Sequence, residues 1–391
     1  MPMRVGLVVP HIFMQRDILP NVIFSPGKLA LELADGLTKL GIEVVLFTPG
    51  EIDSQAQNIT ADLSLFEQEL TCRGDGYLDL LKKHPLTFVT LARQVQGELV
   101  SKAYRMANDN QLDIVHVYTN EEEIAMPFAS LCNKPVVFTH HDPFSFLVRY
   151  KNIMPKYAHL NWVSISYAQR VDMPADTNWV GNVYHGHSDT ILTPISTPIG
   201  DYFTYFGRII QPKGVHLAIQ AVKRYNETAK VPMKLKIAGK HYGESEKNSY
   251  WEEFIVPELN EYIEYVGFIE KSIDKRNFLG NAAALLVPSI FPEPFGMVSI
   301  EALACGTPVV ALNSGALSEV IEDGRTGYVI DKVINESTVL NETATVQSLA
   351  ECLPRVLTID RTDCRKAYEN KFTAELMSQG YLDIYQKLSS L

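Results

Sequence analysis

Short apolar runs that alternate with amphipathic helical segments constrain the fold of this chain more than any other feature of the sequence. Residues 5–9 form the first run, and a helical segment over 28–40 follows and ends at Gly41. Residues 42–47 are then almost continuously apolar, as expected of a strand buried on both faces of a parallel sheet. Three further runs occupy residues 114–118, 136–139 and 162–165. This alternation predicts βαβ units in a doubly wound sheet.

A second unit of the same kind follows a short segment without periodicity. Residues 193–198 read TPISTP and are the best linker candidate in the chain. After it come strand-like runs and a helical segment, at residues 202–206, 215–225, 235–238 and 283–287. The chain of 391 residues is therefore expected to form two Rossmann-like α/β domains, over residues 1–192 and 199–370, with a cleft between them. Residues 363–391 read as an amphipathic helical stretch, whose end, from about 371 to 391, is expected to pack back on the first domain.

Composition excludes several classes of protein. No apolar run approaches the length of a membrane-spanning helix, and residues 1–10 are too short for the hydrophobic region of a signal peptide. The five cysteines are odd in number and lack metal-type spacing, so we expect reduced thiols and a cytoplasmic protein. A net charge of −11 argues against a nucleic-acid partner. The local cluster of Arg149, Lys151 and Lys156 leaves peripheral contact with anionic lipid open. No feature selects an oligomeric state.

Two glutamates mark the most informative stretch, residues 288–310, which read PSIFPEPFGMVSIEALACGTPVV. Glu293 falls in a Pro-rich turn after an apolar strand, and Glu301 falls within the helix that follows. Both are expected at the carboxyl ends of the strands, where doubly wound domains bind ligands. Carboxylates there can accept hydrogen bonds from sugar hydroxyls. The free N–H groups at Phe295, Gly296 and Met297 open the helix, whose positive end favours an anionic diphosphate or a polar sugar.

Two cations lie close together upstream, in the loop FGRIIQPKG at residues 206–214. Arg208 and Lys213 follow the first strand of the second domain and precede its first helix. A diphosphate leaving group gains negative charge as a glycosidic bond breaks, so two fixed cations would stabilise that transition state more than the ground state. No Asp-x-Asp pair or His cluster has convincing ligand spacing, so we expect no metal cofactor.

Residues 293–301, EPFGMVSIE, followed by AxxCGTPVV, closely resemble the E-x7-E signature of the retaining glycosyltransferases of family 4, which have the GT-B fold. The resemblance covers essentially the whole chain and is strongest over residues 206–330. It implies that Glu293 meets the donor sugar near the reacting centre and that Glu301 holds the ribose. It also implies that the backbone of Phe295 and Gly296 contacts sugar hydroxyls, beside Met297 and Val298 at the helix start. Similar Arg and Lys residues act on the diphosphate in the family, which assigns that role to Arg208 and Lys213.

The resemblance also extends to the nucleoside and to the first domain. The segments KIAGK and EYVGFI resemble the nucleoside-binding segments of the family, so backbone groups of Gly239, Val266 and Ile269 are candidates for contact with the base. In VVFTHHDPFS, at residues 136–145, a histidine is by itself more often structural than catalytic, and His140 is interpreted in that way. His141 aligns with the histidine of the family's first domain that reaches the donor sugar or phosphate. Asp142 is expected to orient His141 or to position an acceptor hydroxyl.

The chain departs from the family pattern in two places. Many members have a Gly-Gly loop before the first helix, whereas this chain has Phe24-Ser25-Pro26-Gly27, so a backbone contact with phosphate would fall on Gly27. Many members have His-x-His where this chain has His116-Val117-Tyr118, which makes Tyr118 an acceptor-side candidate. Both changes concern the acceptor side rather than the donor chemistry.

The sequence thus predicts a metal-independent, retaining glycosyltransferase that moves a hexosyl group from a UDP- or GDP-sugar to a carbohydrate or small hydroxyl acceptor. Two alternatives stay open: a sugar-nucleotide epimerase of the same fold, and a non-catalytic protein that binds sugar nucleotides. A dehydrogenase fits poorly because no G-x-G-x-x-G follows the first strand of either domain.

Overall fold

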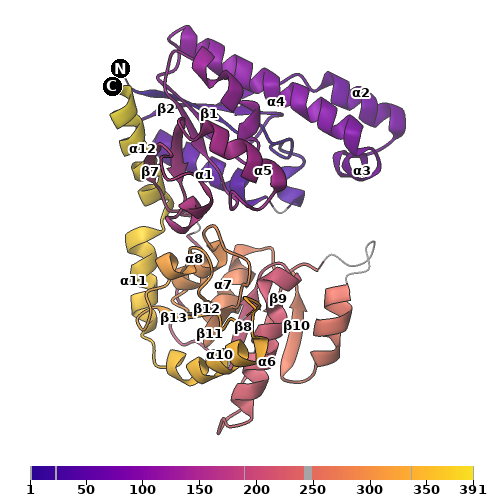
Figure 1. Ribbon diagram of the computed structural model, residues 1–391, viewed down its shortest axis with the longest axis vertical. Coiled ribbons are helices and arrows are strands. Elements are labelled where there is room, and N and C mark those ends of the chain that lie inside the picture. The colour runs from indigo at the N-terminus through magenta and orange to yellow at the C-terminus, as the bar shows by residue number, and fades with distance from the viewer. Residues whose placement is uncertain (1, 23, 189, 242–248, 336, 391) are drawn as a thin grey trace. The chain divides into compact units, whose positions relative to one another are not determined.

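The computed structural model describes residues 2–390, apart from residues 23, 189, 242–248 and 336 (Figure 1). The chain divides into two compact units: Met1–His187 together with Ala374–Leu391, and Ser188–Thr373. Each unit has a sheet whose named strands all pair in parallel. Parallel sheets need helical crossovers between their strands, and Figure 1 shows helices packed around both sheets. The predicted fold class, two Rossmann-like α/β domains, is confirmed.

The first unit contains a seven-stranded sheet in the order β3-β2-β1-β4-β5-β6-β7. Its central strands read as continuous apolar runs because both faces are covered, and every residue of β4 is buried. The strands are β1 (Arg4–Val8), β2 (Glu43–Thr48), β3 (Gln57–Thr60), β4 (Ile114–Tyr118), β5 (Val136–Thr139), β6 (Asn161–Ser164) and β7 (Trp179–Asn182). The α-helices are α1 (Ser25–Lys39), α2 (Ser64–Arg73), α3 (Tyr77–Lys83), α4 (Pro85–Asn108), α5 (Val148–Ile153) and α12 (Ala374–Ser389).

The second unit contains a six-stranded sheet in the order β10-β9-β8-β11-β12-β13. The strand order reverses between β8 and β11, and ligands of open α/β sheets bind at the carboxyl ends of the strands where the order reverses. The strands are β8 (Tyr202–Phe206), β9 (Lys234–Ala238), β10 (Ile263–Gly267), β11 (Ala284–Val287), β12 (Val309–Leu312) and β13 (Gly327–Ile330). The α-helices are α6 (Val215–Asn226), α7 (Ser272–Gly280), α8 (Met297–Ala304), α9 (Leu317–Val320), α10 (Glu342–Val356) and α11 (Arg361–Lys371).

The C-terminal region differs from the single helical stretch expected over residues 363–391. The helix breaks after Lys371, so that α11 belongs to the second unit and α12 to the first. Close packing of α12 on α1 depends on Gly36, because a Cβ there would lie 2.0 Å from the hydroxyl of Ser378. Tyr381 and Tyr385 of α12 are fully buried, and the Tyr385 hydroxyl lies 2.6 Å from Nδ1 of His116 in β4. The last helix therefore completes the core of the first unit.

Two smaller differences have local causes. Helix α1 begins at Ser25, three residues before the predicted start, because Pro26 is tolerated in the first turn, where a backbone N–H has no helical partner. The units divide between His187 and Ser188, ahead of the Pro-rich segment 193–198. The guanidinium of Arg276 donates to the backbone oxygens of Thr193 and Pro194, and these bonds attach the segment to the second unit.

Candidate functional site

The loops after β8 and β11 bring together two of the predicted charged residues. Lys213 ends a short 3-10 helix, Gln211–Lys213, in the loop after β8, and Glu293 lies in the loop after β11. The Lys213 Nζ donates to Oε1 of Glu293 at 2.5 Å, although the two residues are 80 positions apart. Glu293 is only 8% exposed. A pair so little exposed to water is held in place by its own Coulomb attraction and hydrogen bond. Among the described residues, none donates a hydrogen bond to Glu293 Oε2.

The backbone of Glu293 is fixed by a second loop, which follows β12. The carbonyl of Glu293 accepts a hydrogen bond from the Ala316 N–H at 2.8 Å, and Glu293 forms a parallel bridge with Gly315. Gly315 has a φ of +63°, and a Cβ there would lie 2.1 Å from the Glu293 carbonyl oxygen. Only glycine permits this approach, so Gly315 sets the position of the carboxylate.

Gly315→Ala is expected to lower the free energy of unfolding by roughly 3 kcal/mol, because left-handed strain adds to a clash with the Glu293 backbone. Gly200→Ala is the matched control, since Gly200 has a φ of +69° with nothing within 4 Å of an added Cβ. The control should lose only about 1 kcal/mol from the left-handed strain. Urea unfolding of both variants measures the difference. Equal losses would show that the approach of Gly315 to Glu293 contributes nothing.

Glu301, on α8, forms a separate ion pair. Its Oε1 accepts from Nζ of Lys275 on α7 at 2.7 Å, and the side chains are only 16% and 19% exposed. Lys275 also lies 5.4 Å from the centroid of the Phe206 ring, at the end of β8. Sequence reasoning missed Lys275, which lies outside every motif. The only indication in the sequence was that Lys275 lies in the first turn of a helical segment that leads into the next strand.

Arg208, the third predicted cation, lies in the same loop as Lys213 but points into solvent. Its side chain is exposed, and its guanidinium forms no ion pair with any residue that the structure describes. Its backbone carbonyl accepts from the Tyr205 hydroxyl at 2.7 Å, which ties down the start of the loop. Arg208 is therefore a cation on a fixed backbone with its charged end available to an anion.

The start of α8 has the expected geometry. Gly296 adopts a φ of +100° as the N-cap, and its carbonyl accepts from the Ser299 N–H. Phe295 is buried and packs against Phe372, with ring centroids 6.0 Å apart, so its side chain anchors the turn while its backbone remains at the helix start. Met297 and Val298 are half-buried in the first turn of α8.

The expected nucleoside contact at Gly239 is wrong as far as its N–H is concerned. That N–H donates to the Gly267 carbonyl at 3.0 Å, and the Gly239 carbonyl accepts from the Tyr265 hydroxyl. A Cβ at Gly239 would lie 1.7 Å from the Gly207 carbonyl, so this glycine serves close packing of two loops. Val266 is the exposed extra residue of a bulge in β10, and Ile269 is half-buried just beyond that strand. Both remain at the carboxyl edge of the sheet.

In the first unit, His141 follows β5 and is 6% exposed. Its ring lies against the edge of Tyr118, at 4.5 Å between centroids, and is stacked on His185 at 5.2 Å. Neither ring nitrogen has a hydrogen-bond partner within the described part of the chain. Burial, together with the nearby His185, holds the pKa of His141 well below its ordinary value. His141 is therefore a neutral imidazole with both nitrogens unused.

Two predictions for the first unit need correction, and a third residue, Gly27, has a packing role as well. Asp142 does not bond the His141 ring: its carboxylate accepts from the Asn120 amide at 2.7 Å, while the Asn120 side-chain oxygen accepts from the His141 backbone N–H. Tyr118 is fully buried, so its ring supports His141 instead of contacting an acceptor. Gly27 is buried inside α1, and a Cβ there would lie 2.6 Å from atoms of Met14 and Phe24. Gly27 therefore also serves packing, although it lies in the first turn of α1, where a backbone N–H has no partner within the helix.

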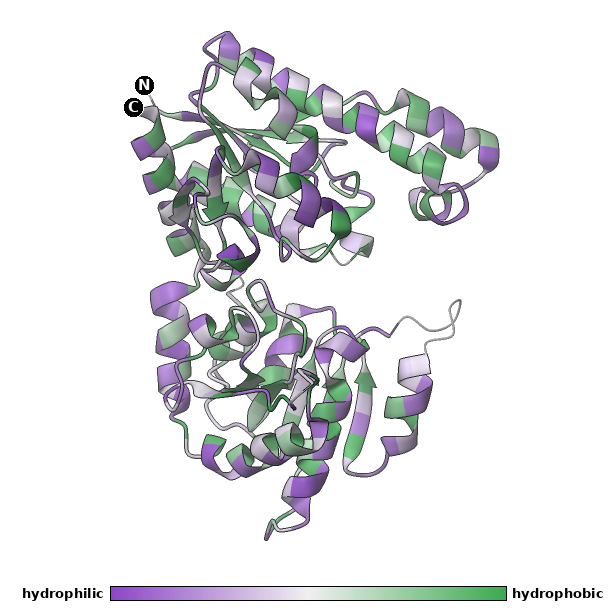
Figure 2. Cartoon of the chain, in the orientation of Figure 1, coloured by the Kyte–Doolittle hydropathy of each residue, from purple (hydrophilic) through white to green (hydrophobic). Residues whose placement is uncertain are grey.

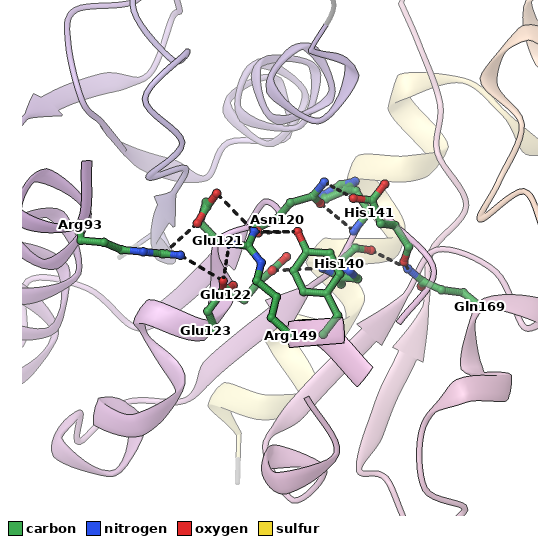
Figure 3. Close-up of polar contacts among 11 residues, drawn as sticks. Arg93, Asn120, Glu121, Glu122, Glu123, His140, His141, Arg149 and Gln169 are labelled. Atoms are coloured by element: carbon green, nitrogen blue, oxygen red, sulfur yellow. Dashed lines mark hydrogen bonds and ion pairs between the residues drawn. The ribbon is translucent and has the colours of Figure 1, made fainter. Parts of the chain in front are cut away.

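A charged network surrounds this region and was missed by sequence reasoning (Figure 3). Glu121 and Glu123 each pair with both Arg93 of α4 and Arg149 of α5, at distances from 2.8 to 3.7 Å. The network links the loop after β4 to two helices. Three consecutive glutamates directly after a buried strand were the available signal.

His140 belongs to the same region and fits the structural interpretation. His140 and Glu122 are both fully buried, with His140 Nδ1 3.1 Å from Glu122 Oε2. Burial lowers the pKa of His140 to about 4 and raises the pKa of Glu122 well above its ordinary value, so burial disfavours the charged form of both side chains.

The described residues contain no group of three or more His, Cys, Asp or Glu side chains arranged to hold a metal ion. All five cysteines are free, as predicted. Among the helices of the described chain, none combines the length and the apolar character needed to cross a bilayer.

Comparisons with known proteins match both units. A model described as Glycosyltransferase Family 4 matches residues 27–194, and one described as Glycosyl transferases group 1 matches residues 200–344. An uncharacterized glycosyltransferase of Methanocaldococcus jannaschii is 31% identical over 193 residues, 49% of this chain and 50% of that protein. Spore coat protein SA of Bacillus subtilis is 25% identical over 185 residues, 47% of this chain and 48% of that protein. The chain thus spans about half the length of these curated relatives.

Solved structures match over the full length and show the fold. Sucrose-phosphate synthase from Thermosynechococcus elongatus superposes with a TM-score of 0.71 at 16% identity, covering 99% of each chain. HepE from Anabaena, in complex with UDP and glucose, superposes with a TM-score of 0.64 at 18% identity, covering all of each chain.

Proposed function

Because the chain belongs to the family 4 glycosyltransferases, which have the GT-B fold, we propose that it transfers a hexosyl group from a UDP- or GDP-sugar to a hydroxyl acceptor, with retention and without a bound metal ion. The observation that carries the proposal is the Lys213–Glu293 pair at the carboxyl ends of β8 and β11, with Lys213 in the same loop as Arg208, whose guanidinium forms no ion pair with any described residue. One carboxylate and two cations are the groups that a sugar diphosphate requires.

In this proposal each charged side chain contacts a different part of the donor. Lys213 and Arg208 act on the diphosphate, whose negative charge grows as the glycosidic bond breaks. Glu293 accepts hydrogen bonds from the donor sugar through the oxygen that Lys213 leaves unused. Glu301, held by Lys275, accepts from the ribose hydroxyls. The N–H groups at the start of α8, from Gly296 to Val298, contact the sugar or the diphosphate, and Val266 and Ile269 lie beside the base.

The first unit carries the acceptor in this proposal, and His141 is its residue for the donor sugar. A neutral, buried imidazole whose nitrogens lack partners can donate or accept one hydrogen bond to a sugar hydroxyl at low cost, since no existing bond is broken. Asp142, held by Asn120, is the candidate for an acceptor hydroxyl. UDP-glucose is the first donor to try, since the Anabaena structure contains UDP and glucose.

A thermal-shift screen of UDP, GDP and ADP tests the donor site. A nucleotide at a hundred times its Kd should stabilise the native state by about 2.7 kcal/mol and raise Tm by about 5 °C or more. The variant Arg208→Ala/Glu301→Ala should fold and lose the shift. A chain that no nucleotide stabilises would contradict the proposed donor site. With the best donor, formation of a glycosylated acceptor identifies a transferase, whereas conversion of the donor to its epimer would contradict transfer.

A further inference from the structure

An exposed apolar segment lies at the carboxyl edge of the first unit, directly after the His141 loop. Phe146, Leu147 and Val148 are three consecutive apolar residues whose side chains are exposed instead of packed in the core. Val148, at the start of α5, is 79% exposed. The Ser145 hydroxyl donates to the carboxylate of Asp172 at 2.5 Å, which places Val171, itself 82% exposed, beside them. In Figure 2 the colour changes from green to purple as this segment enters α5. We call Phe146, Leu147, Val148 and Val171 the apolar edge.

Between Asp142 and Asp172, which border it, the segment that contains the apolar edge carries only cations as charged side chains. The chain as a whole carries a net charge of −11, yet residues 143–171 contain no Asp or Glu and four cations. Two of these cations are used internally: Arg149 pairs with Glu121 and Glu123, and Arg170 donates to Ser164 and to the Gly181 carbonyl. The other two, Lys151 and Lys156, are exposed and form no ion pair with any residue that the structure describes.

We propose that the apolar edge, with Lys151 and Lys156, binds the surface of an anionic lipid bilayer. Large apolar side chains next to free lysines match the two layers of such a surface, with acyl chains below and phosphate groups above. A second copy of the chain is a poorer fit, since a symmetric dimer would place the same lysines of both copies at one interface. Docking requires no spanning helix.

The position of the apolar edge also indicates which class of acceptor the protein uses, and this part of the inference rests on the proposed function. The segment begins at Phe146, four residues after Asp142, the candidate for the acceptor hydroxyl, so a bilayer bound there lies beside the acceptor loop. The acceptor class that fits is an amphipathic molecule whose hydroxyl group is presented at a membrane surface by an apolar anchor.

Co-sedimentation of the full chain with vesicles tests the surface. The chain should bind vesicles of equal parts phosphatidylcholine and phosphatidylglycerol at low salt, and binding should fall about tenfold or more on pure phosphatidylcholine or in high salt. Val148→Glu should weaken binding about tenfold, whereas the matched control Val231→Glu, at a valine that is 72% exposed in the second unit, should not. Lys151→Glu/Lys156→Glu should likewise weaken binding, and the exposed Lys230→Glu should not.

Two results would overturn the membrane surface: a wild-type chain that stays in the supernatant with anionic vesicles, or a Val148→Glu variant that binds as tightly as wild type. Light scattering without vesicles provides a further test, because a fall in molar mass caused by Val148→Glu would assign the edge to a second copy. The nucleotide thermal shift of Val148→Glu should equal that of the wild type. If vesicles bind but no nucleotide does, the proposed function fails and the membrane surface stands.

Discussion

Lys213→Met is expected to lower kcat for sugar transfer about 10²–10³-fold, with a much smaller effect on KM. The methionine keeps most of the volume of the side chain but removes the charge that meets the diphosphate as it leaves. Because that charge grows only in the transition state, the loss falls on kcat. Initial rates over a range of donor concentrations give both constants, and Lys271→Met, at an exposed lysine before α7, is the control that should leave them unchanged.

Stability must be separated from chemistry in this experiment, since Lys213→Met also leaves Glu293 with little exposure to water and no cation. An unpaired carboxylate in such a place costs stability, so the variant should unfold at lower urea than the wild type. Lys213→Met/Glu293→Leu removes both charges and should recover most of the stability while the activity stays low. A double variant that regains activity, or a single variant with normal kcat, would contradict the role of Lys213.

Acidification from pH 7.5 to 5.5 is expected to reduce the free energy of unfolding. Five histidines cause the loss. Burial lowers the pKa of His116 and His185 to about 3 and that of His11 and His140 to about 4, and it holds the pKa of His141 well below its ordinary value. Below pH 6.5 the unfolded chain takes up a proton at each of them and the folded chain does not. Each therefore costs about 1.4 kcal/mol at pH 5.5.

Protonation of Glu122 has the opposite effect on the free energy of unfolding. Its pKa in the folded chain is raised well above the ordinary value by burial, so on acidification the folded chain takes up a proton at a higher pH than the unfolded chain does. Burial also raises the pKa of Glu121. Acidification therefore favours folding at these two groups and offsets part of the loss from the histidines.

Urea unfolding at the two pH values measures these contributions. His185→Asn should reduce the acid loss by about 1.4 kcal/mol, and Glu122→Gln should enlarge it, because each removes one of the opposing groups. His159→Asn is the control: His159 is exposed and should change neither value. A wild-type chain with equal stability at both pH values would show that the histidines titrate normally in the folded state.

Most of the fold could be predicted from local pattern. Strand β4 was placed at its observed bounds, 114–118, because a strand buried on both faces must be apolar throughout. Helix α6 was placed to within one residue for a similar reason, since its apolar face repeats every 3 to 4 residues. The C-terminal region was less predictable: periodicity identified helix there, but not the break between α11 and α12, which lie in different units.

The site was predictable where a motif fixes backbone geometry and unpredictable where side chains meet across the fold. Glu293, Gly296 and Glu301 come from one continuous stretch, so their order along a turn and a helix follows from sequence. The partners of the two glutamates do not: Lys275 was missed, and the bond between Lys213 and Glu293 spans 80 residues. Gly239 and Tyr118 were misassigned for the same reason, because the groups that satisfy or cover them belong to other strands and helices.

By itself, then, the sequence determined two α/β units and the carboxyl-edge location of the charged residues of the second, since periodicity and turn chemistry act over a few neighbouring residues. Tertiary structure alone decided which oxygen of Glu293 bonds Lys213, which glycines pack against other loops, and how α12 completes the first core. These depend on distances between atoms that are remote along the chain, and close packing sets such distances to within tenths of an ångström.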